Sequence, residues 1–192
     1  MLHKLDSMCY VIRCLMYYST IKTLKMLYYA YFHSAMMYGI ISWGNLVESN
    51  KVFLHQNSFV RTILGINLWS TCRPHIKTVG IVTVPSQCIL SWMEFLVNNL
   101  AYFSLNSEIH NKFTRSMKCL QYLQVDLLLY QKGVYYMSIK VFNSLPNCIT
   151  DLVQNKKKFI GKLKSVLLEQ SSYLVNNFLD YCGTLWEIEC LW

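Results

Sequence analysis

The sequence predicts a mostly α fold, a compact helical domain of about six or seven helices with at most a short strand pair. The first reason is that 54% of the 192 residues are hydrophobic, which is enough for a substantial core. The second is that apolar residues recur three and four positions apart along most of the chain, as on one face of a helix. Strand character is confined to residues 81–84, which form a brief strand or an extended link.

Two helices are predicted in the N-terminal quarter, over residues 4–18 and 21–42, with Ser19-Thr20 ending the first and capping the second. The apolar residues of the second helix are Leu24, Leu27, Tyr28, Tyr31, Phe32, Ala35 and Tyr38. On its opposite side lie Lys22, Lys25, Tyr29 and His33. Gly39 and Gly44 are expected to loosen this helix and turn the chain.

A membrane span is an alternative for the same stretch, because no charged residue lies between Lys25 and Glu48. That length suffices, since a bilayer requires only about 20 apolar residues. The stretch is polar on one side, however, and His33-Ser34 would fall in the middle of the bilayer. We therefore expect a core helix and no membrane partner.

Further helices are predicted along the rest of the chain. A helix capped by Ser49 or Asn50 runs to Leu64 and ends at Gly65. The others are a short helical turn from residue 72, a long apolar helix over 86–103, a short helix over 134–144, an amphipathic helix after Asp151, and a last helix over 173–192. In the helix after Asp151 one face carries Phe159, Leu163, Val166 and Leu167, and another carries Lys158, Lys162, Ser165 and Glu169.

Charge and cysteine content restrict the class of protein. The net charge of +8, from 18 basic and 10 acidic residues, suits a polyanionic partner. Only 15% of residues are charged, against about 25% in ordinary soluble domains, which indicates an apolar side meant for a neighbour. The eight cysteines form no CxxC pair and are typical of free thiols in an intracellular protein of the cytoplasm or nucleus.

Short blocks of sequence resemble, in order, the region after the palm in reverse transcriptases of non-LTR (LINE-type, jockey-like) retrotransposons. The blocks are Cys9–Arg13, Tyr28–Ser34 with Tyr38-Gly39 and Trp43-Gly44, Gln56 with Arg61–Gly65, Cys72–Pro74, Asn106–His110, Thr114-Arg115, Tyr130–Tyr136 and Phe142–Pro146. The resemblance covers residues 1–180 as one thumb-like helical region and leaves residues 181–192 as a tail outside it.

The resemblance implies a thumb that grips the template–primer duplex through its phosphate backbone, with RNA or an RNA–DNA hybrid and the palm and fingers of the parent polymerase as partners. It implies no cofactor. We expect contact residues Lys22, Lys25, Arg61, Arg73, Lys77, Lys158 and Lys162. The chain is not expected to be an enzyme, because Asp6, Asp126, Asp151 and Asp180 are isolated and polymerases need paired carboxylates for two metal ions.

Other chemistry has weaker support. Cys72-x-x-His75 has the spacing of half a zinc site, but no second close pair accompanies it. No nucleophile elbow or phosphate-binding glycine loop is present. Several family positions have lost charge, such as Asn57-Ser58 where basic residues are usual. The alternatives to nucleic-acid contact are a helical protein–protein interaction module, a non-functional element remnant and a small membrane protein.

Overall fold

A computed structural model describes residues 2–67, 69–107 and 119–189, with side chains described as far as Cys182. Within these residues the chain is helical, and eight α-helices are seven or more residues long, more than the six or seven predicted. These helices are α1 (Leu2–Leu15), α2 (Ile21–Leu27), α5 (Ser49–Leu64), α6 (Arg73–Val79), α7 (Val84–Asn98), α10 (Val134–Ser144), α12 (Lys156–Gln170) and α13 (Val175–Glu189). Shorter segments are the π-helix η1 (Tyr28–His33), α3 (Ser34–Met37), α4 (Ile40–Trp43), the 3-10 helix η2 (Leu100–Tyr102), α9 (Leu128–Gln131) and α11 (Asn147–Thr150).

Strand structure in this part of the chain is limited to an isolated antiparallel bridge between Leu105 and Leu120. The stretch before α7 that favoured a strand is an extended link, in which Ile81 and Val82 are buried. The blocks at 108–110 and 114–115, and the end of the tail at 190–192, lie outside the described residues.

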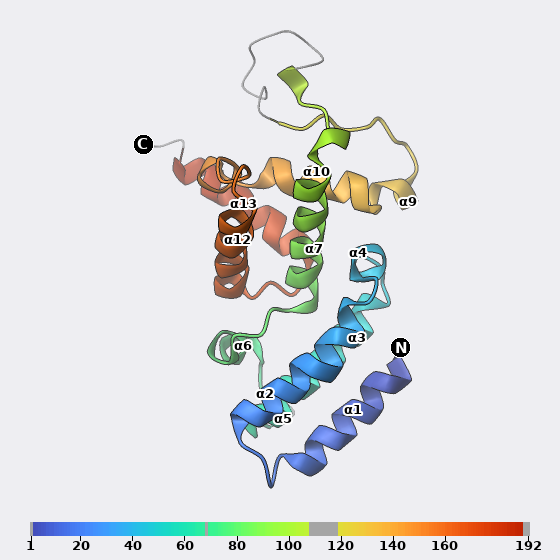
Figure 1. Cartoon of the computed structure of the whole chain (residues 1–192), viewed down its shortest axis with the longest axis vertical. Helices are drawn as coiled ribbons and strands as arrows, with labels where there is room; N and C mark the ends of the chain where they lie inside the picture. The colour runs from blue at the N-terminus through green and yellow to red at the C-terminus, as the bar shows by residue number, and fades with distance from the viewer. Residues whose placement is uncertain (1, 68, 108–118, 190–192) are drawn as a thin grey trace.

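Helix α7 lies at the centre of the molecule, between the N-terminal helices and the C-terminal ones (Figure 1). Thr83 caps it by accepting a hydrogen bond from the backbone N–H of Ser86, and Pro85 occupies its first turn, where its missing N–H costs nothing. Trp92 is fully buried, and its indole N–H donates to the carbonyl of Ile41 at 3.1 Å. The apolar sequence of α7 therefore reflects burial on nearly all sides.

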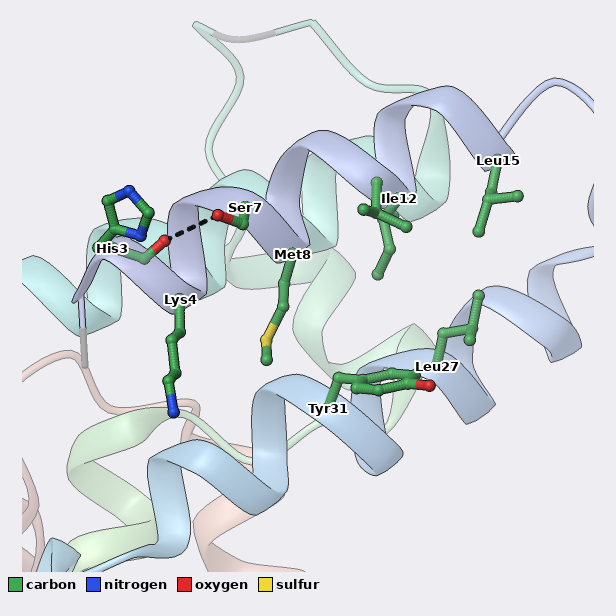
Figure 2. A pocket seen from close by; sticks show the side chains of 9 residues that line it. His3, Lys4, Ser7, Met8, Ile12, Leu15, Leu27 and Tyr31 are labelled. Atoms are coloured by element: carbon green, nitrogen blue, oxygen red, sulfur yellow. Dashed lines mark hydrogen bonds between the residues drawn. The ribbon is translucent and has the colours of Figure 1, made fainter.

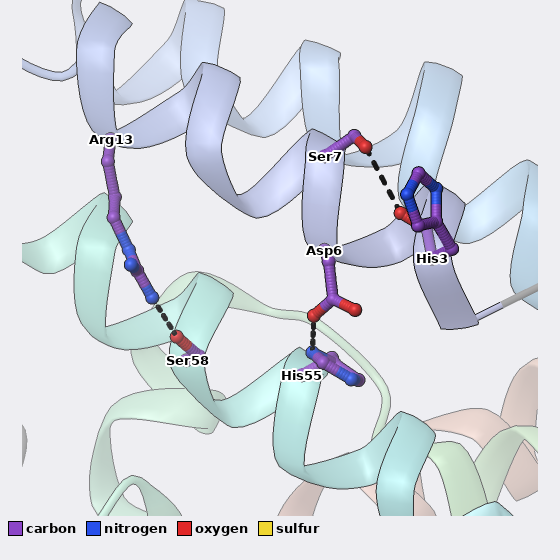
Figure 3. A network of polar contacts seen from close by, with 6 residues as sticks. All are labelled: His3, Asp6, Ser7, Arg13, His55 and Ser58. Atoms are coloured by element: carbon purple, nitrogen blue, oxygen red, sulfur yellow. Dashed lines mark hydrogen bonds and ion pairs between the residues drawn. The ribbon is translucent and has the colours of Figure 1, made fainter.

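The N-terminal helices α1, α2–η1–α3 and α5 pack together on one side of α7 (Figure 1). Two polar contacts join α1 to α5 (Figure 3): Asp6 Oδ1 lies 3.3 Å from Nδ1 of His55, and Arg13 donates to Oγ of Ser58 at 3.2 Å. These contacts lie on the α5 side of α1 and fix the position of α1 against α5.

Gln56 on α5 connects three parts of the core. Its amide nitrogen donates to the hydroxyl of Tyr28 and to the carbonyl of Val82, each at 2.8 Å, and its amide oxygen accepts from the N–H of Val84 at 2.9 Å. The side chain is 1% exposed, so these three hydrogen bonds satisfy its buried polar atoms.

The predicted helix over residues 21–42 exists, but it is divided. Thr20 caps it as expected. The π-helical turn η1, which the sequence did not indicate, lies in its middle, and Gly39 interrupts it with φ +68°, a left-handed conformation that glycine adopts at little cost. Helix α5 ends at Gly65 as predicted, but Glu48, rather than Ser49 or Asn50, occupies its N-cap position.

The faces of this helix differ from the prediction. Its buried residues recur every four positions: Leu24, Tyr28, Phe32, Met36 and Ile40. Tyr31 and Tyr38 are 56% and 84% exposed, so the apolar face is wider than the surface that the core covers. The opposite side also packs, because the Lys25 ammonium donates to the carbonyl of Val79 and the Tyr29 hydroxyl donates to that of Gly80.

The C-terminal helices confirm their predicted patterns more closely. Helix α10 spans the predicted residues and ends before Pro146. In α12 the residues Phe159, Leu163 and Leu167 are buried, while Lys158 and Lys162 are exposed, as the amphipathic pattern predicted.

Four of the cysteines in the described region are buried free thiols, namely Cys9, Cys72, Cys88 and Cys182; Cys14 and Cys148 are exposed instead. Burial is the main cause that raises the pKa of Cys88 to about 12, so this thiol stays protonated. No single described helix has the length and apolarity to cross a membrane, although α6 and α7 satisfy both criteria together as a pair bent by 55°.

Candidate nucleic-acid interface

The seven predicted contact residues lie on four helices: Lys22 and Lys25 on α2, Arg61 on α5, Arg73 and Lys77 on α6, and Lys158 and Lys162 on α12. Each of these four helices contacts at least one of the others. Helix α12 packs on α6 and α7, and the end of α6 meets α2 through Lys25. Helix α5, which carries Arg61, contacts α2 and α6, and Arg61 itself donates to the loop before α6. The structure therefore brings the α6 and α12 cations together, with α2 alongside.

Two of the seven cations donate hydrogen bonds to backbone carbonyls. The Lys25 ammonium donates to the carbonyl of Val79 in the last turn of α6, where a cation complements the negative end of the helix dipole. The guanidinium Nε of Arg61 donates to the carbonyl of Ser70 at 3.1 Å. Both side chains are half-buried, so they present less charge to a ligand than the sequence indicated.

Arg73 and Lys77 are exposed on α6 and border a surface hollow of about 540 Å³ against the end of α12. We call this the α6–α12 hollow; its other lining residues are Pro74, Glu169, Gln170 and Ser171. The guanidinium carbon of Arg73 lies 5.6 Å from the ring centre of Tyr173, a cation–π arrangement that orients the arginine. The hollow carries two cations and one carboxylate, that of Glu169.

Helix α12 carries five exposed lysines, at 156, 157, 158, 162 and 164. Three of them occupy its first turn, directly after the N-cap Asn155, whose side chain accepts from the N–H of Lys158 at 3.3 Å. The N-terminal end of a helix has positive character, so anions are favoured there and cations are disfavoured. The last turn has no basic residue and contains Glu169. The charges of α12 thus run opposite to the preference of its own dipole.

None of these lysines, and neither Arg73 nor Lys77, pairs with a carboxylate at ion-pair distance within the described residues. Lys156 and Lys157 border a second hollow of about 480 Å³ with Glu94, Val97 and Asn98 at the end of α7. The positive charge of α12 is therefore largely uncompensated and faces solvent.

His33 is close enough to this basic helix to interact electrostatically with Lys164. Burial is the main cause that lowers its pKa; a hydrogen bond with the side chain of Gln87 opposes the shift, and the charge of Lys164 adds to it. His33 is therefore neutral near pH 7. Lys164 belongs to the lysine-rich run, but the sequence did not distinguish it, because its closeness to His33 depends on the packing of α12.

Metal chemistry finds no support in the residues that the structure describes, where no group of three or more His, Cys, Asp or Glu side chains could hold an ion. In the Cys72-x-x-His75 pair the thiol of Cys72 is buried and lies 3.6 Å from the carbonyl of Asn57. Burial raises the pKa of this thiol, whereas metal ligation requires the thiolate.

Comparisons of the chain with models of protein families, with curated proteins and with solved structures found no match. The residues that the structure describes form a helical domain around the buried helix α7, and the lysines of α12 lie exposed on its surface.

Proposed function

We propose that this chain binds the phosphate backbone of RNA or of an RNA–DNA hybrid, without sequence selectivity and without catalysis of its own. This is the role expected of a thumb-like region of a non-LTR retrotransposon reverse transcriptase, the family that the sequence resembles. Phosphate contacts position a protein on a duplex but carry little sequence information.

The proposal depends mainly on the run of lysines in the first turn of α12. Three lysines in succession follow Asn155 at the end of a helix where cations are disfavoured, and within the described residues none of them lies at ion-pair distance from a carboxylate. Folding alone does not favour this arrangement. A polyanion would be held there both by the lysines and by the helix dipole.

Arg73 and Lys77 extend the basic surface past the other end of α12. Lys158 and Glu169 are separated by 11 positions, and at 1.5 Å per residue this corresponds to about 16 Å along the helix axis. Adjacent phosphates on one DNA strand advance about 3.4 Å along the axis, so the surface spans several of them. Lys22 is exposed, and we expect it to contact phosphates as well. Lys25 and Arg61 contribute mainly to the fold.

The test is binding of the purified chain to a short RNA–DNA hybrid over a series of salt concentrations. Each phosphate contact adds about −0.7 to −0.9 to the slope of log affinity against log salt. We expect a slope equivalent to several contacts, and we expect the double variant Lys158→Glu/Lys162→Glu to reduce it.

The matched control is Lys51→Glu/Lys140→Glu, which alters the net charge equally at exposed positions on α5 and α10. Equal losses in the two double variants would show that only net charge matters and would refute a site on α12. Absence of binding at low salt by the folded chain would refute the proposal. It would favour the alternative that the chain is a non-functional remnant of a retrotransposon.

A protein partner is the second candidate function. Leu127, Leu128, Leu129 and Tyr130 are consecutive and between 63% and 75% exposed, an apolar run of the kind found at protein interfaces. The palm and fingers of a parent polymerase would be such a partner. Pairing that persists at high salt and is lost in Leu128→Asp/Leu129→Asp would favour this candidate.

A further inference from the structure

A deep groove separates α1 from the α2–η1 segment, with a volume of about 530 Å³. It is lined from α1 by His3, Lys4, Ser7, Met8, Val11, Ile12 and Leu15, and from the facing helix by Leu27 and Tyr31. We call it the α1–α2 groove. Binding sites for small molecules typically have volumes of about 300–1,000 Å³ and mainly apolar walls, and this groove satisfies both conditions.

The groove is polar at one end and apolar at the other (Figure 2). Lys4 extends from α1 toward the facing helix at one end, and Leu15 and Leu27 close the other end. Met8 and Ile12 point into the middle, and the ring of Tyr31 lies along the opposite wall. Lys4 pairs with no carboxylate in the described part of the chain.

The two walls of the groove are positioned by different contacts. Helix α1 packs chiefly on α5, where Asp6 contacts His55 and Arg13 contacts Ser58, and it packs less extensively on α2 and η1. The facing wall contains Tyr31 of the π-helical turn, 56% exposed, and such turns occur frequently at functional sites. The apolar surface that Tyr31 and Leu27 present belongs to the predicted apolar face that the core covers incompletely.

We propose that the α1–α2 groove binds a monomeric single-chain amphiphile with a carboxylate head, that is, a fatty-acid-like molecule. The carboxylate lies at Lys4, and the chain extends over Met8, Val11 and Tyr31 toward Leu15. The distance from Lys4 to Leu15, 11 residues, is about 16 Å along α1, which suits a medium-length acyl chain. A partner helix of the same length, about 10–12 Å across with its side chains, would occupy roughly 1,300–1,800 Å³, more than twice the volume of the groove. This site is independent of α12 and its lysines.

The experiment is calorimetric titration of the purified chain with dodecanoate below its critical micelle concentration, with dodecanol as the uncharged probe of equal length. We expect saturable one-to-one binding of dodecanoate by the monomer and weaker binding of dodecanol. Val11→Glu, which places a carboxylate against the acyl chain, should lower the affinity by about tenfold or more. Lys4→Glu should lower it by about threefold.

The matched controls are Tyr10→Glu, at an exposed apolar position of α1 outside the groove, and Lys51→Glu; both should leave the affinity within about twofold of the parent. Circular dichroism establishes that each variant keeps its helical content. Should Val11→Glu lose helicity, Val11→Ser takes its place, with an expected loss of about threefold.

Four results would overturn the proposal. If dodecanol binds with equal affinity and Lys4→Glu has no effect, the carboxylate of the ligand does not contribute to binding. Equal effects of Val11→Glu and Tyr10→Glu would show that the ligand binds outside the groove. Sedimentation showing that the chain dimerises in step with saturation, or binding to phosphatidylcholine vesicles in place of monomeric dodecanoate, would assign the groove to a second copy or to a lipid surface.

Discussion

The segment from α2 through α3 and helix α12 are both amphipathic in sequence, yet they use their two faces differently. In α12 the apolar residues Phe159, Leu163 and Leu167 are buried, Val166 is half-buried, and the lysines are exposed to solvent. In the α2–α3 segment the polar side packs against α6 and α7, while part of the apolar side is exposed in the α1–α2 groove. An amphipathic pattern thus predicts burial well when the polar face is densely charged. It predicts burial less well when that face contains tyrosine, histidine and single lysines, which can pack as well as be solvated.

The largest expected effect concerns the buried residues of the α2–α3 segment, and it tests which part of the apolar side the core covers. Phe32 is fully buried, its ring centre lies 4.9 Å from that of Phe59, and it stacks on Tyr28. Phe32→Ala should lower the free energy of unfolding by about 3–5 kcal/mol, because it removes these contacts and leaves a cavity. Tyr38→Ala, on the same predicted face but 84% exposed, should change it by less than about 0.5 kcal/mol. Urea denaturation measures both; similar losses would mean that Tyr38 is buried after all.

The sequence predicted the helical class, the C-terminal ends of α5 and α10, and the inward face of α12. These depend on local signals: apolar spacing, a glycine at the end of a helix and a proline after one. It did not predict η1, the packing of Lys25, Tyr29 and His33, or the hydrogen bonds of Gln56. These depend on which helix lies opposite, and single-helix periodicity contains no such information. The exposure of the α12 lysines could be predicted from sequence because it follows from the amphipathic pattern of that helix alone.

A pair of glycine substitutions tests the same contrast between crowded and open helices. A Cβ added at Gly44 would lie 2.5 Å from Sγ of Cys88 and 2.6 Å from the carbonyl oxygen of Ile40. Gly44→Ala should therefore cost about 1–3 kcal/mol through overpacking. At Gly161, in the middle of α12, nothing lies within 4 Å of such an atom, and Gly161→Ala should stabilise the protein by about 0.5–1 kcal/mol. Denaturation midpoints of the two variants should move in opposite directions; a shift of both in the same direction would contradict this difference in packing.

The reversed charges of α12 give a prediction that separates binding from folding. Lys158→Glu and Glu169→Lys each bring a charge into agreement with the helix dipole, so each should raise the free energy of unfolding by about 0.3–1 kcal/mol. Their effects on binding to an RNA–DNA hybrid should be opposite. The first removes a proposed phosphate contact, and the second adds a cation beside Arg73 and Lys77 in the α6–α12 hollow. Binding that simply follows stability, rising in both variants, would show that α12 does not contact the phosphates.

The smallest effect concerns His33, where the two regions meet. Its folded pKa lies below the ordinary value of 6.5, because of burial and the charge of Lys164. Between the folded pKa and 6.5 the unfolded chain binds more protons than the folded one, so stability falls as the pH decreases below 6.5.

The loss from this one group should be under about 1 kcal/mol, because His33 is only half-buried and solvent screens it. His33→Gln should remove this part of the pH dependence, and Lys164→Gln should weaken it by removing a nearby positive charge. His75→Gln, the same substitution on α6, serves as the control. The measurement is urea denaturation from pH 5 to pH 8. A pH profile unchanged by Lys164→Gln would mean that the basic helix and the α2–α3 segment are electrostatically independent, so the lysines of α12 would act on a ligand alone.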